Sequence, residues 1–377
     1  MALSKIDLSN MVENDLAAGS QPLTIIENKI NFRNIVINGD MSQAQRGTST
    51  ASITSSGYYT VGRFQFEPSN LGTWTMSQST TVPSGQGFAK SLKLDCTTAD
   101  GSPASGDLLA LQQRIEGQNL QYLKKGTSSA ESTTLSFWVR SNKTGTYICE
   151  LRDLDNSRTI NKSYTISSAD TWEKKTITFA GDTSGALDND NAASLYVRWW
   201  LGAGTDYTSG TLQTSWGSST NANRAVGQVN LGDSTSNEWY VTGVQLEVGT
   251  AASDFEFLPI DVNKQRCFRY FYRSVVESNG IGFFCSMTNA ALACVHQFPA
   301  IMRAVPTMGY GWTSSYTGNT FVDLITGSVA TWTLTQNQVG REGVKNIYDN
   351  SKTGYTVGRH FGTHMEADAE LWVINGN

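Results

Sequence analysis

The chain has 377 residues, of which only 16% are charged, and its formal net charge is −5. Because the chain also has no run of Lys or Arg, a nucleic-acid partner is not expected, since phosphate backbones are bound by clustered cations. No apolar stretch approaches the roughly 20 residues that a membrane helix needs, and the first ten residues lack the basic and apolar regions of a secretory signal, so we expect a soluble chain without membrane insertion.

Residues 1–33 show no sustained periodicity and hold too little apolar surface to fold alone. Their apolar patch contains Leu23, Ile25 and Ile26. We predict an extended N-terminal attachment arm that becomes ordered when this patch docks on a partner protein.

Residues 34–258 predict an antiparallel β-sandwich of two sheets. Short segments alternate polar and apolar residues, and Gly, Asn, Asp and Pro separate them. These segments are residues 91–94, 134–139, 147–151, 174–179, 194–201 and 238–248. Only residues 108–125 have apolar spacing that suits a helical turn. We therefore predict an all-β fold, in which a second, smaller β-rich module at residues 259–377 follows the sandwich.

Three tryptophans lie within these predicted strands. Trp138, between Phe137 and Val139, is expected to fill the sandwich core, with stacking on a sugar as the alternative. Trp199 and Trp200 are adjacent, so their side chains point to opposite faces of a sheet and only one of them fits in the core. The other must be exposed or covered by a neighbour, which makes the pair a candidate for a binding surface or for contact with a partner subunit.

Two further regions carry aromatic residues among Gly, Ser, Thr and Asn. Residues 202–237 contain Tyr207 and Trp216, and this mixture is typical of adaptable recognition loops. The alternative is that Trp216 pins the loop to its own sandwich. The last stretch, from residue 309 onward, carries Trp312 and Tyr316, which we expect to be exposed and able to contact a ligand.

No pattern predicts a metal site, a cofactor or a catalytic centre. The five cysteines are widely spaced without a CxxC pair, which indicates buried hydrophobic positions and not a disulfide framework. The acidic cluster that starts at Asp182 has the composition of turns and lacks calcium-loop spacing, and the pair His360 and His364 has no third ligand nearby. A phosphate-binding glycine loop, a nucleophile elbow and a repeat pattern are all missing from the sequence, so we expect no enzyme.

Several separated motifs resemble those of tail-fibre or minor tail proteins of tailed bacteriophages, in the same order along the chain. They are residues 34–41 (NIVINGDM), 45–47 (QRG), 59–64 (YTVGRF), 135–139 (LSFWV), 227–230 (GQVN) and 240–249 (YVTGVQLEVG). The resemblance implies a jelly-roll sandwich similar to carbohydrate-binding modules, a place in the virion and a homotrimer. In that setting the N-terminal arm would dock on other virion proteins.

These observations lead to three functional hypotheses. The first is a fibre, exposed on the phage particle and made in the host cytoplasm, that binds a host cell-surface polysaccharide during adsorption. Its glycan-contact candidates are Tyr207, Trp216, Trp312 and Tyr316. The second is an architectural head, neck or tail decoration protein without receptor binding. The third is a glycan depolymerase, which would need two suitably spaced carboxyl groups.

Overall fold

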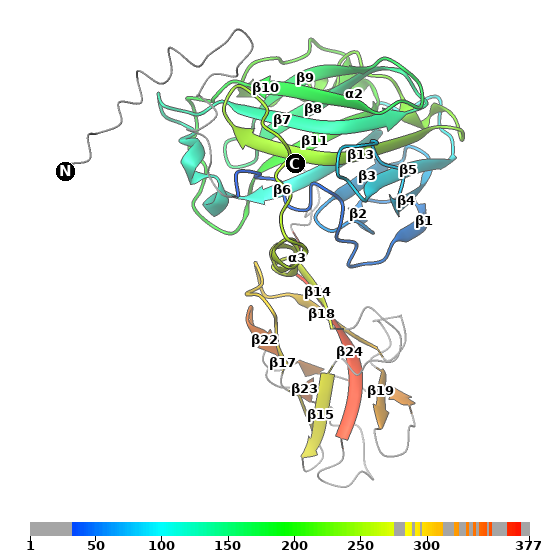
Figure 1. Ribbon diagram of the computed structural model, residues 1–377, viewed down its shortest axis with the longest axis vertical. Helices are drawn as coiled ribbons and strands as arrows, with labels where there is room; N and C mark the ends of the chain where they lie inside the picture. Colours follow the sequence, from blue (N-terminus) through cyan, green and yellow to red (C-terminus); the bar gives the residue numbers. More distant parts are fainter. Residues whose placement is uncertain are drawn as a thin grey trace, which may run out of the picture.

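The structure is a computed structural model, and it is nearly all β (Figure 1). It describes residues 32–274, 283–288, 291–294, 296–311, 320–323, 329–331, 335–336, 339–344, 347–348 and 360–370. Residues Leu23, Ile25, Ile26, Trp312 and Tyr316 lie outside the described residues. Among the helices in the described part of the chain, none is long and apolar enough to cross a membrane.

Two antiparallel sheets form the sandwich that the alternating segments predicted. Sheet A consists, in spatial order, of β1 (Ser49–Ile53), β4 (Thr73–Ser79), β5 (Ser91–Thr98), β13 (Glu238–Val248), β7 (Thr133–Ser141) and β10 (Glu173–Phe179). Sheet B consists of β12 (Gly217–Ser218), β9 (Arg158–Ile166), β8 (Gly145–Asp153), β11 (Ala193–Ala203), β6 (Leu108–Glu116), β3 (Gln65–Ser69) and β2 (Gly57–Tyr58). Most connections pass from one sheet to the other, so the sandwich is a jelly roll.

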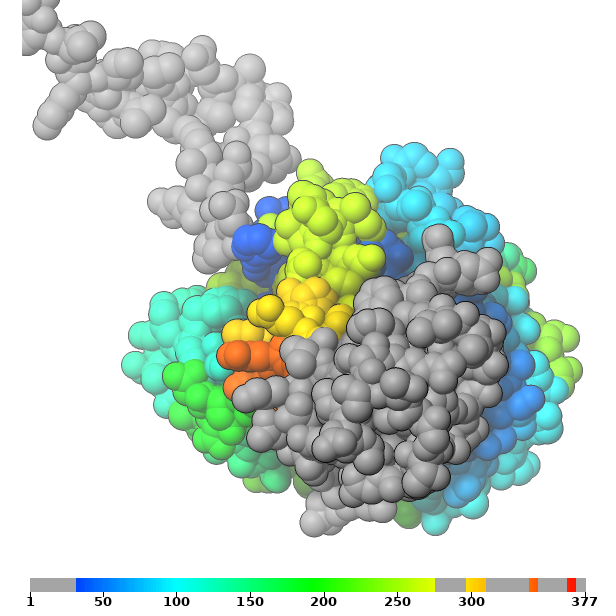
Figure 2. Space-filling view, turned by 90° about the horizontal axis from the view of Figure 1, so that it is seen from below, coloured from blue at the N-terminus to red at the C-terminus, as the bar shows by residue number. Residues whose placement is uncertain are grey.

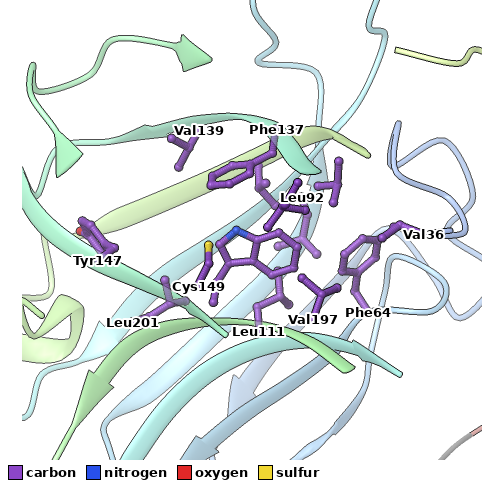
Figure 3. Packing of buried hydrophobic residues seen from close by; sticks show 14 of the residues in the cluster. Val36, Phe64, Leu92, Leu111, Phe137, Val139, Tyr147, Cys149, Val197 and Leu201 are labelled. Atoms are coloured by element: carbon purple, nitrogen blue, oxygen red, sulfur yellow. The ribbon is translucent and has the colours of Figure 1, made fainter. Parts of the chain in front are cut away.

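One continuous apolar core fills the space between the sheets (Figure 3). Alternate residues of each strand point into it, such as Phe137 and Val139 of β7 and Val197 and Trp199 of β11. Trp199 contacts Phe137 edge to face, with ring centroids 5.6 Å apart. Truncation of a fully buried aromatic of this kind typically costs about 3–5 kcal/mol, so these inward positions are constrained by packing.

The segment around Asn34 and Asn38 crosses the end of the sandwich and is held by buried amide side chains. The Asn34 side chain donates to the carbonyl of Val244 at 2.9 Å and accepts from the amide of Val36 at 3.0 Å. Asn38 adopts a left-handed backbone conformation, and its side chain bonds the backbone of Gln43 and Gly62. These contacts explain physically why asparagines occupy both positions.

The segment at residues 108–125 divides into two parts. Its first half is strand β6, and its second half contains the 3-10 turns η2 (Gly117–Asn119) and η3 (Gln121–Leu123). Short turns also occur as α2 (Thr205–Thr208), η4 (Asn221–Asn223) and η5 (Leu231–Asp233). The expected helical turn is thus confined to residues after Glu116.

The chain leaves the sandwich through helix α3 (Ile260–Phe268) and enters a second sheet region. Its strands are β14 (Phe271–Arg273), β15 (Phe283–Thr288), β16 (Ala291–Cys294), β17 (His296–Gln297), β18 (Thr307–Gly311), β19 (Thr320–Asp323), β20 (Val329–Thr331), β21 (Thr335–Gln336), β22 (Gly343–Val344), β23 (Ile347–Tyr348) and β24 (His360–Asp368). β24 pairs with β14, β15, β18 and β19, and so joins most of this region.

Arginines of the sandwich fix this second region in place. Arg63, almost fully buried, forms an ion pair with Glu370 and lies 3.4 Å from the ring centroid of Tyr270. Arg46 pairs with Asp368 at 2.9 Å. Because both arginines come from the sandwich and both carboxylates follow or end β24, the two regions are joined by buried or half-buried charges.

Candidate functional site

Trp199 and Trp200 are both fully buried within the chain. Trp199 lies in the core, whereas Trp200 lies on the outer side of sheet B and is covered by residues of the 203–225 segment. The ring of Tyr207 is 5.2 Å from that of Trp200, and the guanidinium of Arg224 is 5.0 Å from it. The prediction that this pair contacts a partner subunit is therefore wrong, because the chain's own loop covers the outward indole.

The outer side of sheet B is filled by a buried ionic network. Glu150 accepts hydrogen bonds from Arg224 at 2.9 Å and from the indole of Trp200 at 2.9 Å. Burial alone would raise the pKa of Glu150, but Arg224 and Arg198 outweigh it and hold this pKa below its ordinary value. Arg198 in turn pairs with Glu67 at 2.5 Å. The charges of Glu150 and Glu67 are thus paired with arginines within the sheet.

The two loop candidates are only partly accessible. Tyr207 is half-buried over Trp200. Trp216 is half-buried and packs against the core, and its indole donates to the carbonyl of Ala180 at 2.7 Å. Lys125 lies 5.4 Å from the Trp216 ring. These contacts correspond to the alternative in which Trp216 pins the loop to its own sandwich.

Trp138 lies outside the core, contrary to the expectation from sequence. It is half-buried, and it belongs neither to the core cluster nor to the residues that pack against it. Its neighbours Phe137 and Val139 both point into the core, so the strand alternation directs the Trp138 side chain to the outer face of sheet A. The same alternation that identified the strand was sufficient to place this indole.

Two more aromatic residues lie beside Trp138 on this outer face. Trp138 is the register partner of Lys174 in β10 and of Thr242 in β13. Trp172 and Tyr240 occupy positions two residues away from those partners, and such diagonal neighbours are within reach of aromatic side chains. The rings of Trp172 and Tyr240 are 6.1 Å apart in an edge-to-face arrangement. We call Trp138, Trp172 and Tyr240 the sheet A aromatic face.

Accessibility differs among the three rings. Tyr240 is buried at 5% exposure, whereas Trp138 and Trp172 are both half-buried. The indole nitrogen of Trp172 is shielded from solvent and has no hydrogen-bond partner among the described residues. Trp172 precedes its strand, and no pattern in the sequence separated it from a core tryptophan.

Charged groups surround these rings and neutralise one another. Glu238 bonds Lys93 at 2.6 Å and Arg140 at 3.2 Å. Burial alone would raise the pKa of Glu238, but its hydrogen bond and charge interaction with Lys93 hold the pKa below its ordinary value. Arg140 lies 4.9 Å from the Tyr240 ring, and Lys174 is exposed beside Trp138. The face therefore combines half-exposed indoles with nearby hydrogen-bonding groups, which suits stacking on a polar, ring-shaped ligand.

The acidic cluster has a structural explanation. Asp182 pairs with Arg158 at 2.7 Å and with Lys125 at 3.0 Å, so its oxygens bind cationic side chains. Within the described ranges, no group of three or more His, Cys, Asp or Glu side chains has the geometry of a metal site. Cys96, Cys149 and Cys267 are buried free thiols.

No family model and no curated protein matches this sequence. Solved structures with some likeness include the enzymatically active domain of tailspike protein 4 of bacteriophage CBA120, at 14% identity and a TM-score of 0.31, covering 58% of this chain and 22% of that one. A putative sugar binding protein from Bacteroides thetaiotaomicron has 13% identity, a TM-score of 0.33 and coverage of 57% and 100%. A family 11 carbohydrate-binding module from Clostridium thermocellum, in complex with a β-1,3-1,4-mixed-linked tetrasaccharide, has 11% identity, a TM-score of 0.26 and coverage of 55% and 98%. These scores are too low to bear on ligand or activity.

Proposed function

We propose that this chain is a bacteriophage virion fibre protein that binds a host cell-surface polysaccharide through the sheet A aromatic face. The observation that carries the proposal is the position of Trp138 and Trp172, two half-exposed indoles outside the core on one sheet face. Large indoles are normally buried in a sandwich core, so a pair kept at the surface favours a binding role. The phage setting is supported by the motif order along residues 34–249.

The geometry favours an extended glycan over a small compact ligand. The three aromatic positions come from the neighbouring strands β7 and β13 and from the residue just before β10, so they lie across the sheet. Neighbouring strands are about 4.8 Å apart, which places stacking positions along a line that a sugar chain can follow. Exposed Lys174 and Thr176 lie along the same edge and supply hydrogen-bond donors.

No catalytic step is part of this proposal. A glycosidase needs a general acid with a raised pKa, and a second carboxylate at a defined separation from it. The pKa of Glu238, the carboxylate beside the aromatic rings, is shifted in the opposite direction by Lys93. We therefore propose a binding protein and not a depolymerase.

A binding face of this size gives modest affinity per copy, so attachment would depend on several copies acting together. We propose a homotrimer, exposed as an appendage on the particle, that docks on other virion proteins through residues 1–33. The alternative is an architectural decoration protein, in which another virion subunit would cover the same aromatic face.

The test is binding of the purified full-length protein to polysaccharide extracted from the host surface. We expect Trp138→Ala and Trp172→Ala each to weaken single-site binding about tenfold, in line with the roughly 1–3 kcal/mol lost when a contact aromatic is truncated. Trp216→Ala is the matched control, because Trp216 is also half-buried but packs against its own sandwich. Thermal unfolding of each variant checks that the fold is intact.

The outcomes separate the hypotheses. If Trp216→Ala is the only variant that loses polysaccharide binding, the glycan site lies in the 202–237 loop and not on the sheet A aromatic face. Unchanged binding in folded Trp138→Ala and Trp172→Ala would refute the aromatic face. Absence of any glycan binding by the unmodified trimer would favour the architectural alternative, and release of reducing ends from the polysaccharide would indicate a depolymerase.

A further inference from the structure

A pocket of about 500 Å³ lies where the sandwich meets helix α3. Its walls come from residues 32–37, the end of β6 with η2, Tyr122 of η3, and α3. Figure 2 views this end of the molecule, where the blue start of the described chain lies beside the yellow-green residues leading into α3. The volume falls within the range of about 300–1,000 Å³ that is usual for small-molecule sites. We call it the junction pocket.

Arg266 of α3 lines the junction pocket without a carboxylate partner. Its hydrogen bond within the described part of the chain is to the backbone carbonyl of Asn34, at 3.3 Å. By contrast, the neighbouring Arg269 pairs with Glu116 at 2.6 Å. The nearby carboxylate of Glu256 accepts the backbone amides of Phe32 and Asn34, at 2.9 and 3.0 Å, and forms no ion pair with Arg266 within the described residues. The Arg266 guanidinium thus faces the pocket without a carboxylate at ion-pair distance among the described residues, although the charge of Glu256 favours its protonated form.

Burial makes the charge of the unpaired Arg266 side chain less favourable. Desolvation lowers the pKa of Arg266, and the neighbouring groups that favour its protonated form, Glu256 among them, do not reverse that shift. A half-buried guanidinium without a paired anion is destabilising on its own. The hydrogen bond to Asn34 satisfies only part of its five-donor group, so an external anion would complete it.

Two exposed aromatic rings face the same pocket. Tyr122 is 43% exposed and Phe32 is 55% exposed. Burial raises the pKa of Tyr122 to about 12 despite the opposing charge of Arg266, which lines the same pocket. The amides of Gln118 and Asn119 are exposed at the rim. The pocket therefore offers apolar ring surface, uncharged hydrogen-bonding groups and three arginines, Arg114, Arg266 and Arg269, of which Arg269 is paired with Glu116.

We propose that the junction pocket binds a sugar unit that carries a carboxylate, with the carboxylate on Arg266 and the sugar ring against Tyr122. A guanidinium binds a carboxylate through two parallel hydrogen bonds, and a monoanion is sufficient to pair the single charge of Arg266. This inference rests on the proposed function, because it specifies an acidic unit within the host glycan. It concerns a site distinct from the sheet A aromatic face.

The test is calorimetric titration of the full-length protein with glucuronate, glucose and glucose 6-phosphate. We expect glucuronate to bind at least about tenfold more tightly than glucose and than glucose 6-phosphate. Arg266→Gln should weaken glucuronate binding at least about tenfold. Lys264→Gln is the matched control, because it removes an exposed cation from the same helix and should leave binding unchanged.

Tyr122→Ala, at an exposed position, is a second variant that remains informative if Arg266→Gln does not fold, and it should weaken glucuronate binding severalfold. The proposal is overturned if the unmodified protein does not bind glucuronate, if glucose or glucose 6-phosphate binds as tightly, or if a folded Arg266→Gln or Tyr122→Ala binds glucuronate normally. Trp138→Ala should retain glucuronate binding while its polysaccharide binding is weakened about tenfold. A Trp138→Ala variant that retains both glucuronate and polysaccharide binding would leave the junction pocket intact and refute the aromatic face.

Discussion

The buried carboxylate of Glu150 should be one of the most sensitive positions in the sandwich. It lies on the outer side of sheet B and accepts hydrogen bonds from Thr159 at 2.8 Å, from Arg224 at 2.9 and 3.1 Å and from Trp200 at 2.9 Å. Glu150→Gln keeps the shape of the side chain but removes its charge and one acceptor. Arg224 would then be a buried cation without a counter-charge, which typically costs about 3–5 kcal/mol.

Urea denaturation followed by tryptophan fluorescence measures this loss, provided that two spectroscopic probes give the same transition. Glu131→Gln is the matched control: its pair with Lys124 has side chains 36% and 53% exposed and should contribute under about 1 kcal/mol. Replacing Glu150 and Arg224 together by Leu should restore much of the stability, because no charge is then left unpaired. A cost for Glu150→Gln no larger than that for Glu131→Gln would refute the reasoning.

Four further predictions follow from the structure. The arginine partners of Glu150 and Glu116 lower the pKa values of both carboxyl groups despite burial. The stabilisation from these two ion pairs is therefore present above the ordinary glutamate pKa of 4.5 and should be lost as the pH falls below that value. Denaturation midpoints measured from pH 6 to pH 3 should decrease, and a flat profile would contradict the lowered pKa values. Gly39→Ala should destabilise the sandwich by more than about 1 kcal/mol in the same urea assay, because the added Cβ would overlap the carbonyl of Val244, and a neutral result would contradict this geometry. Light scattering at micromolar concentration should give the mass of a trimer, and a monomer would refute the homotrimer. Deletion of residues 1–33 should leave a folded trimer that no longer enters particles, and persistent incorporation would show that this segment is not the anchor.

Strand periodicity was enough to predict the sandwich, and it also contained the information that places Trp138. Phe137 and Val139 were recognisable as core residues, and two neighbours that point inward require an outward side chain between them. The general preference of strand tryptophans for the core was the weaker argument. For Trp200, alternation showed that it points away from Trp199 but not what covers it.

What covers Trp200 depends on contacts between segments that are far apart in the sequence. Trp200 is covered by Tyr207 and Arg224, and its indole bonds Glu150 of another strand. Such a network depends on how β8, β11 and the 203–225 segment meet, which no local pattern specifies. Helix α3 was not predicted, because Ile260–Phe268 buries only Asn263 and Cys267 and has no apolar stripe.

The most direct test of the central claim is fluorine NMR of the protein labelled with 5-fluorotryptophan. The chain has ten tryptophans, and their resonances can be assigned by single Trp→Phe substitutions. On titration with host surface polysaccharide, we predict that the signals of Trp138 and Trp172 shift while those of the buried Trp199 and Trp200 stay constant. A titration in which binding occurs but the signals of Trp138 and Trp172 do not move would contradict the account.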